Sequence, residues 1–334
     1  MLVLRSFAVS ILVLLMVAVS ASAQETVLRI TLQLPMASHL GQNLLMFKDE
    51  VETASDGEIE VQIFDSAQLY RDAEVPQAVG SGAIDMGVVS LTRYVGDIPA
   101  VDIFYIPFMF DTEALARAAT DPESPVRQLI DDAILTTGAR VLWWQAYGGS
   151  VFVSNGAPIA SPDDVAGRRV RVFGRTVGNW IESMGGAPSL ISGSEQFLAY
   201  QRGTVDIGMT GIAGVQSRSL WDVMDTVTAT NYALVEFLVV INEDFWEDLP
   251  QRHRDIIVAA ARNAEIAVRD EIARIEAGAY EAAAMNGMEI YTPTEAEMVA
   301  WRASAAPVIE AYLADSGDLG QRIHDAAAAL RDED

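Results

Sequence analysis

An arginine-rich segment at residues 167–175 (GRRVRVFGR) carries the most specific chemistry in this sequence. Alternation with a period of two places Arg169, Arg171 and Phe173 on one face of a short strand. Salt bridges to surface acids explain Arg168 and Arg169, whereas Arg171 stands toward the carboxyl end of the strand. A guanidinium there offers two parallel donors to a carboxylate, so Arg171 is a candidate anion-binding residue.

Catalytic chemistry is not indicated elsewhere in the sequence. The chain has no cysteine, and its three histidines, at positions 39, 253 and 324, are too scattered for a metal site. The nucleotide-binding motifs GxxxxGK and GxGxxG and the nucleophile motif GxSxG are all absent. Asp163 and Asp164 follow a serine and a proline, where acids suit the first turn of a helix. We therefore expect no enzyme activity, no cofactor and no metal site.

The charge and length of the chain limit its partners and its organisation. Lysine and arginine total 22 against 47 acids, giving a formal charge of -25 at pH 7. Nucleic acid is not an expected partner, because its phosphates are bound by positive charge. The 334 residues are 51% hydrophobic, which predicts folded structure and suits two domains.

The first 23 residues have the pattern of a secretory signal peptide. Arg5 precedes an apolar run over residues 7–19, and Ala21 and Ala23 form a small-x-small end. A membrane anchor is the alternative, but the run is shorter than the roughly 20 residues that a span needs. We expect export to the periplasm and cleavage after about Ala23.

The elements that must position Arg171 follow an α/β pattern. Residues 27–32 alternate as a strand, residues 44–54 repeat at helical spacing, and residues 59–63 alternate again. A strand–helix–strand order with short connections predicts a parallel sheet with helices on its faces.

Two segments of the chain resemble each other at one constant offset. Residues 74–87 (EVPQAVGSGAIDMG) match residues 195–208 (EQFLAYQRGTVDIG) at a glutamate, an alanine, two glycines and an aspartate. Each predicts a helix ended by a glycine and followed by a strand that begins at Ile84 or Val205. Chance similarity is one interpretation, and two lobes of like topology with a cleft between them is the other.

Two apolar strand candidates and a long helix would join the lobes. The strand candidates are residues 140–147 and 233–241, and a helical pattern runs from about Pro250 to Met285. A helix of that length, roughly 50 Å, spans more than one small domain. A coiled-coil dimer is the alternative, but the face lacks a sustained heptad. We predict lobe I at 24–146, lobe II at 147–232, and the return strand, long helix and C-terminal helices at 233–334.

An ordered set of short motifs resembles the solute receptors of the tripartite ATP-independent periplasmic (TRAP) transporters, the DctP-type family. The motifs cover most of the chain after residue 23. They are SDGEIEV (55–61), QL (68–69), GAIDM (82–86), IPFMF (106–110), GRRVR (167–171), MGGAP (184–188), SE (194–195), QRGTVD (201–206) and FWEDLP (245–250).

The resemblance implies a two-lobed α/β periplasmic binding protein fold, with crossing hinge strands and a long helix spanning both lobes. It also implies that Arg171 holds the ligand carboxylate. The sequence departs from the family pattern in three places: Thr210 stands where an asparagine is common, no arginine follows Gly148 and Gly149, and Gly193 replaces an aromatic residue.

The resulting candidate ligand-binding residues are six in number. Glu236 is open to a second interpretation, a buried hinge carboxylate paired with an arginine, and Trp180 is expected in the core rather than at the ligand. The six candidates are Glu74, Tyr147, Arg171, Arg175, Thr210 and Glu236.

The function implied is capture of a small organic anion and its delivery to the TRAP membrane permease. A periplasmic sensory protein is the main alternative. A periplasmic enzyme acting on a small acid is a further one, disfavoured because no nucleophile–base pair is present.

Overall fold

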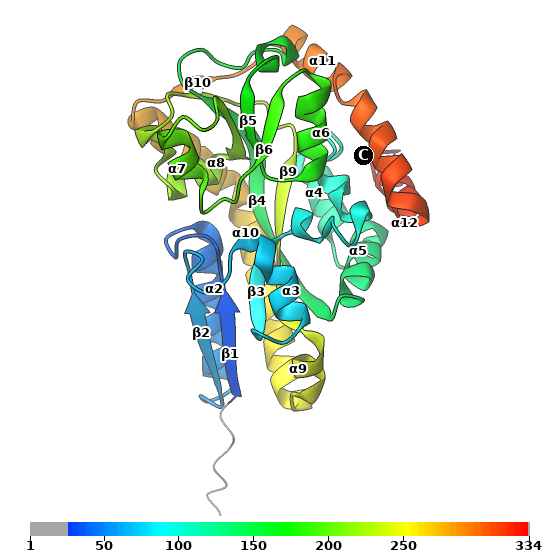
Figure 1. Cartoon of the computed structure of the whole chain (residues 1–334). Helices are drawn as coiled ribbons and strands as arrows, with labels where there is room; N and C mark the ends of the chain where they lie inside the picture. The colour runs from blue at the N-terminus through cyan, green and yellow to red at the C-terminus, as the bar shows by residue number, and fades with distance from the viewer. Residues whose placement is uncertain (1–25, 333–334) are drawn as a thin grey trace, which may run out of the picture.

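The protein has two lobes joined by crossing strands, as Figure 1 shows for the computed structural model. The structure describes residues 26–332, so the predicted signal peptide lies outside the described residues. Parallel strands with helices on both faces form each lobe, which confirms the predicted two-lobed α/β fold.

One continuous sheet runs through both lobes. Its strand order is β2-β1-β3-β9-β4-β7-β5-β6, and β8 joins β4 at one side and pairs with β10. The outer strands of each lobe are parallel, while β9 and β4 in the middle run antiparallel to their neighbours.

The first lobe holds the parallel strands β2, β1 and β3, with α2 and α3 packed beside them (Figure 1). Ser38 caps α2 by accepting from the Gly41 N–H. Its elements are β1 (Thr26–Thr31), α2 (His39–Ala54), β2 (Ile59–Phe64), α3 (Val75–Gly80), β3 (Met86–Ser90), α4 (Glu113–Thr120), α5 (Pro125–Leu135) and the 3₁₀ turns η1 (Asp72–Glu74), η2 (Leu91–Tyr94) and η3 (Pro99–Tyr105).

The second lobe repeats this plan with β6, β5 and β7. Ser161 and Asp164 form a capping box at η4, so the acidic pair there is structural. Its elements are η4 (Pro162–Val165), β5 (Arg169–Val172), α6 (Arg175–Ser183), β6 (Ala187–Leu190), α7 (Gln196–Gln201), β7 (Ile207–Gly211), α8 (Ile212–Ser217), η5 (Leu220–Asp222) and β8 (Thr226–Thr228).

Strands β4 (Ala139–Ser154) and β9 (Leu234–Asn242) cross between the lobes as an antiparallel pair. The predicted boundary at 146/147 falls inside β4, where the register shifts between Ala146 and Gly148. The two glycines at 148–149 therefore lie in a strand rather than a turn, with Gly148 at φ 101°. Such a shift bends the strand locally and increases its twist.

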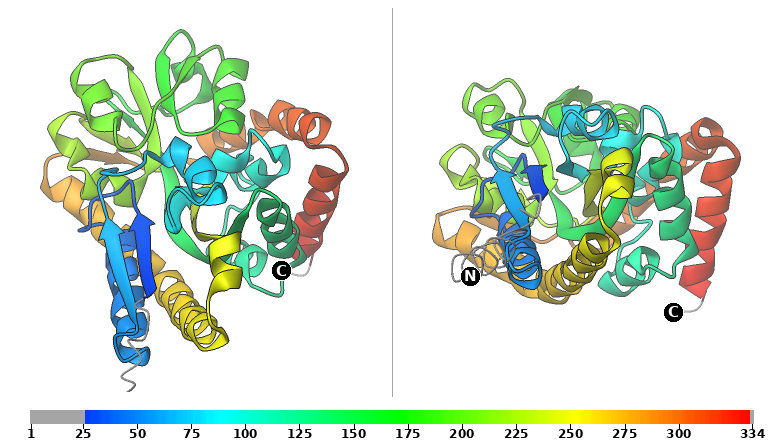
Figure 2. Two further views of the ribbon diagram at one scale, coloured as in Figure 1. Left: turned by 60° about the horizontal axis from the view of Figure 1, so that its bottom comes forward. Right: turned by 90° about the horizontal axis from the view of Figure 1, so that it is seen from below.

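The predicted long helix is α10 (Gln251–Met285), which packs against α2 of the first lobe and α8 of the second. Figure 2 shows it crossing behind both lobes, while α12 covers the opposite side beside α5. Thr294 and Glu297 form a capping box at the start of α11. The remaining elements are α9 (Glu243–Asp248), β10 (Glu289–Tyr291), α11 (Glu295–Ala303) and α12 (Ala306–Asp332), the last kinked at Gly317.

The sequence repeat corresponds to equivalent strands in the two lobes. Asp85 accepts from the backbone N–H and the guanidinium of Arg29, and Asp206 makes the same contacts with Arg169. The strands begin at Met86 and Ile207, two residues later than predicted. Just before each strand, the aspartate side chain, rather than a backbone carbonyl, accepts the N–H of Arg29 or Arg169 on the neighbouring strand.

An aromatic cluster lies where the second lobe meets the C-terminal helices. The rings of Phe152, Tyr232 and Trp301 lie 5.2–6.1 Å from one another or from Trp180. Trp180 is fully buried and donates from Nε1 to Ser304 at 2.8 Å. It is a core residue, as predicted.

Candidate functional site

A pocket lies between the lobes, against the crossing strands. It contains about 370 Å³ of empty space, including solvent at its mouth. Its lining residues are Gln33, Asp72, Ser90 and Arg93 of the first lobe, Tyr147, Val235 and Phe237 of the crossing strands, and Arg171, Phe173, Gly193, Gln196, Thr210, Gly211 and Arg218 of the second lobe.

Arg171 is in this pocket, and its guanidinium is held by the protein backbone. Nε donates to the Ile191 carbonyl at 3.0 Å and Nη1 donates to the Met209 carbonyl, while no acidic residue within 26–332 forms an ion pair with it. The residue is only 3% exposed, and burial lowers the pKa of its guanidinium. A buried cation without an acidic partner is costly, and a bound anion would remove that cost.

The first lobe contributes an arginine that has its own acid. Arg93 Nε donates to Asp72 at 2.5 Å, and both side chains are nearly buried. Asp72 also accepts from the Ser90 N–H at 2.9 Å, which fixes the carboxylate at the end of β3. The remaining N–H groups of Arg93 stay available to a ligand, because only Nε has a partner within the described residues.

Tyr147 lines the pocket from the first crossing strand. Its hydroxyl accepts from Arg218 Nη1 at 2.9 Å, and its ring stacks on His39 with centroids 5.4 Å apart. Burial lowers the pKa of His39 to about 4, so the imidazole is neutral at neutral pH. Tyr147 therefore contacts a neutral ring on one side and a cation at its hydroxyl.

Thr210 and Gln33 supply uncharged polar groups from opposite lobes. Thr210 is 4% exposed and lies in β7, opposite Val151 of β4. Gln33 is equally buried, and its Oε1 has no hydrogen-bond partner within the described residues. A ligand hydroxyl or ammonium group would satisfy that oxygen.

Two of the predicted residues, Arg175 and Glu74, lie outside the pocket. Arg175 is the first residue of α6, is exposed, and lines a separate small hollow with Tyr312 and Asp315. Glu74 is exposed and its carboxylate accepts from the Arg71 N–H at 2.7 Å. Its role is to cap a 3₁₀ turn, because the chain there turns the carboxylate back onto its own backbone.

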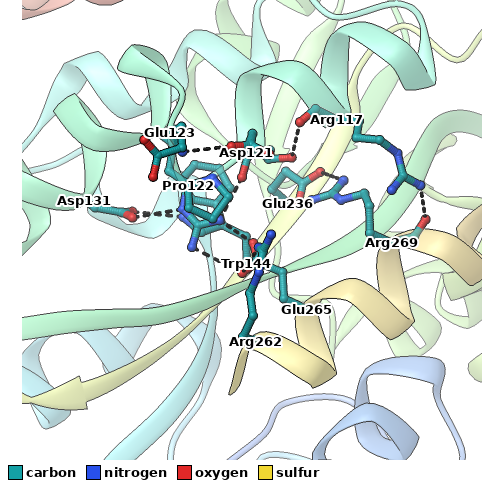
Figure 3. Close-up of polar contacts among 12 residues, drawn as sticks. Arg117, Asp121, Pro122, Glu123, Asp131, Trp144, Glu236, Arg262, Glu265 and Arg269 are labelled. Carbon is teal, nitrogen blue, oxygen red and sulfur yellow. Dashed lines mark hydrogen bonds and ion pairs between the residues drawn. The ribbon is translucent and has the colours of Figure 1, made fainter. Parts of the chain in front are cut away.

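Glu236 is the third predicted residue outside the pocket, and the second interpretation of it is the correct one. It is 1% exposed and forms a bidentate pair with Arg269 of α10, at 2.7 and 2.8 Å (Figure 3). Burial raises the pKa of the Glu236 carboxyl, and the paired arginine opposes that rise. The pair fixes the return strand against the long helix.

A second buried ionic group lies beside this pair, as Figure 3 shows. Arg127 contacts Glu265 of α10 and also Asp131, whose other oxygen accepts from Trp144 Nε1 at 2.9 Å. Burial raises the pKa of Asp131 to about 6. The charged side chains behind the crossing strands thus pair with one another, whereas Arg171 in the pocket has no acidic partner within the described residues.

The pocket residues not found from the sequence include Gln33, Asp72, Arg93 and Arg218. They come from loops and short turns, where no periodic pattern marks a side chain's direction. One signal was present for Arg93, which follows the carboxyl end of β3 by three residues.

The described residues contain no group of His, Cys, Asp or Glu side chains that could hold a metal ion. Within residues 26–332, no helix is both long and apolar enough to cross a membrane.

The comparisons with known proteins agree with this geometry. The model of bacterial extracellular solute-binding protein family 7, DctP, matches residues 32–315. The chain belongs to this family. Membership confirms the resemblance seen in the sequence and the solute-receptor class that it implies.

Individual relatives are similar in sequence and in fold. The C4-dicarboxylate-binding periplasmic protein DctP of Shewanella loihica is 25% identical over 293 residues, covering 86% of this chain and 85% of its own. The galactonate complex of DctPAm from Advenella mimigardefordensis has a TM-score of 0.87 at 22% identity, covering 92% and 99%. DctP7 of Bordetella pertussis, a receptor binding pyroglutamic acid, has a TM-score of 0.84 at 22% identity, covering 91% and 99%. These relatives are solute-binding receptors rather than enzymes.

Proposed function

We propose that this protein is a periplasmic receptor that captures a small organic carboxylate between its lobes and delivers it to TRAP membrane subunits. One observation carries the ligand class: Arg171 is buried in the interlobe pocket without an acidic partner. The names of the relatives, which refer to acids, support the same class.

Binding would act through lobe closure. A ligand carboxylate on Arg171 also meets the first lobe, where Arg93 and Gln33 line the pocket, so it bridges the two walls. Because those contacts exist only when the lobes are together, the ligand shifts the open–closed equilibrium toward the closed state. We propose that lobe I (24–146) and lobe II (147–232) move about β4 and β9, and that the closed form docks on the permease.

The proposed location is the periplasm, with removal of the signal peptide after about Ala23. The match to a relative named as periplasmic supports this location, and mass spectrometry of the secreted chain would give the cleavage site.

Arg171→Met tests the proposed ligand class. A thermal-shift screen of the wild type with succinate, galactonate, pyroglutamate, lactate and the zwitterion ectoine would identify a ligand, because a molecule that binds only the folded state raises Tm. Calorimetry should then show affinity falling about 30-fold or more in Arg171→Met, as expected for removing one partner of a buried charged contact.

The matched control is Arg202→Gln, which changes an exposed arginine of the same lobe outside the pocket. Its affinity should equal that of the wild type. Equal affinity in Arg171→Met, or a screen in which no carboxylate raises Tm, contradicts the proposal.

A further inference from the structure

The pocket holds more positive charge than its own acid neutralises. Three arginines line it, and Asp72 is the single acidic residue among the lining residues. Asp72 pairs with Arg93, whereas neither Arg171 nor Arg218 forms an ion pair within residues 26–332. One ligand carboxylate on Arg171 would leave Arg218 without a counter-charge.

Arg218 is seated so that its guanidinium lies in the pocket wall. It stands at the end of α8 and donates from Nη1 to the Tyr147 hydroxyl at 2.9 Å. Tyr147 is held by His39 on one side and by Phe237, with ring centroids 5.1 Å apart, on another. A tyrosine packed in this way fixes one edge of the guanidinium and leaves its other donors free.

Two glycines make the room that this guanidinium occupies. A Cβ on Gly193 would lie 2.9 Å from Arg218 Nη2, and a Cβ on Gly214 would lie 3.1 Å from Arg218 Nη1. A side chain at either position would push the guanidinium from its place. Gly193 is also one of the positions at which the sequence departs from the family pattern.

The position of Gly193 links Arg218 to the opposite lobe. Its Cβ would also lie 2.9 Å from Gln33 Oε1, an atom of the first lobe. The two lobes therefore approach each other at Gln33, Gly193 and Arg218. Closure of the lobes removes water from around the Arg218 guanidinium. Charged contacts strengthen as water is excluded.

The two unpaired arginines also act on each other. Burial lowers the pKa of Arg171, and the positive charges of Arg218 and Arg93 lower it further. Like charges in one pocket repel, so the closed pocket without ligand is electrostatically unfavourable. A ligand with two acidic groups neutralises both guanidiniums, whereas a ligand with one does not.

We propose that Arg218, held by Tyr147 and accommodated by Gly193 and Gly214, is a second anion-binding residue that selects ligands with two acidic groups over ligands with one. This inference rests on the proposed function, in which Arg171 holds the first carboxylate.

The test compares matched acids that differ in the second carboxylate. Calorimetry of the wild type would use succinate against butyrate, glutarate against pentanoate, and galactarate against galactonate. In at least one pair the diacid should bind about 10- to 100-fold more tightly, the effect of one charged hydrogen-bonded contact. In Arg218→Gln this preference should fall below about threefold, and Arg218→Lys should keep part of it.

The ratio of the two affinities separates selection from a structural effect, because a damaged pocket weakens both members of a pair equally. Arg202→Gln is again the control, and its ratio should match the wild type. Monoacids that bind the wild type as tightly as diacids, or a ratio unchanged in Arg218→Gln, overturn this inference and leave the proposed function standing. A screen in which no acid binds overturns both.

Discussion

The two lobes share a strand framework, and the residue at one equivalent position of that framework shows how they differ. In the first lobe Thr31 of β1 lies opposite Gly87 of β3, and in the second Arg171 of β5 lies opposite Gly208 of β7. The strands before these positions are joined by the same bidentate arginine–aspartate pair. The comparison teaches that Arg171, the proposed anion-binding residue, lies on a repeated scaffold whose strand-joining contacts are the same in both lobes.

The lobes also differ in how they balance charge at the pocket. The first lobe supplies Arg93 together with its partner Asp72, so its contribution is neutral. The second lobe supplies Arg171 and Arg218 with no lining acid of its own. In the proposed binding mode, the attraction for an anion therefore comes from the second lobe, and the first lobe completes the enclosure.

The largest effect on stability is expected from giving position 31 the residue found at the equivalent position 171, and the reverse change is its comparison. Thr31→Arg would bury a guanidinium in a fully buried site without an acid, lowering the free energy of unfolding by at least about 4 kcal/mol. Arg171→Thr opens space into a polar pocket that admits water, so it should cost no more than about 1.5 kcal/mol. Urea unfolding of the ligand-free proteins measures both.

A similar loss of stability in both variants would show that Arg171 has a structural role. Binding gives the complementary result, since Arg171→Thr should lose carboxylate affinity despite its near-normal stability.

A smaller effect is expected from breaking the shared arginine–aspartate pairs one at a time. Asp85→Asn should lower the free energy of unfolding by about 2 kcal/mol and Asp206→Asn by about 1 kcal/mol, because the Asp85 side chain is 10% exposed and that of Asp206 is 31% exposed. Urea titrations at neutral pH would rank the two. An equal loss of stability in both variants would mean that the different solvent exposure of Asp85 and Asp206 does not set the strength of their ion pairs.

The second-lobe pair also predicts a pH dependence. Hydrogen bonds from Arg169 lower the pKa of Asp206 to about 2, below its ordinary value of 3.8. Because the folded-state pKa is the lower one, the pair's contribution is complete above about pH 5 and is lost as the pH falls toward 2. Asp206→Asn should therefore reduce the acid-induced loss of stability by about 1 kcal/mol. If the free energy of unfolding changed with pH in the same way in wild type and variant, Asp206 would not be the group responsible for the acid-induced loss.

The smallest effect is expected from the ion pair that joins the lobes at the surface. Arg71 lies 3.4 Å from Glu195, and the two side chains are 61% and 47% exposed. Arg71→Gln should change the free energy of unfolding by less than about 0.5 kcal/mol and ligand affinity by less than about twofold. A tenfold loss of affinity would instead make this pair part of the closing mechanism.

The sequence predicted the features that recur in both lobes or along a strand and missed the features that occur only once. Alternation along β5 placed Arg171 on the correct face, and the internal match identified the equivalent strands. Arg218 could not be placed in the same way, because it follows a six-residue helix and precedes Ser219 in the left-handed region. Its direction depends on Tyr147, a residue of another strand that no local pattern connects to it.

The three misplaced candidates have a shared physical cause. Arg175 follows strand β5, Glu74 ends the 3₁₀ turn before α3, and Glu236 is in the crossing strand β9. Each side chain instead points to solvent, to its own backbone or to α10. Position along the chain was predictable, but the direction of each side chain was set by the contacts available to it, of which only the Glu236–Arg269 pair is tertiary.

The crossing strands have a consequence for how the molecule folds. Ala139 pairs with Asn242 and β9 pairs with β3, so the sheet of the first lobe is completed only after the chain has passed through the second lobe and returned. Contacts between residues so distant in sequence make folding slow and give a high contact order. The first lobe is therefore not a continuous stretch that could be excised and expressed alone, and equilibrium unfolding should follow a single cooperative transition rather than one for each lobe.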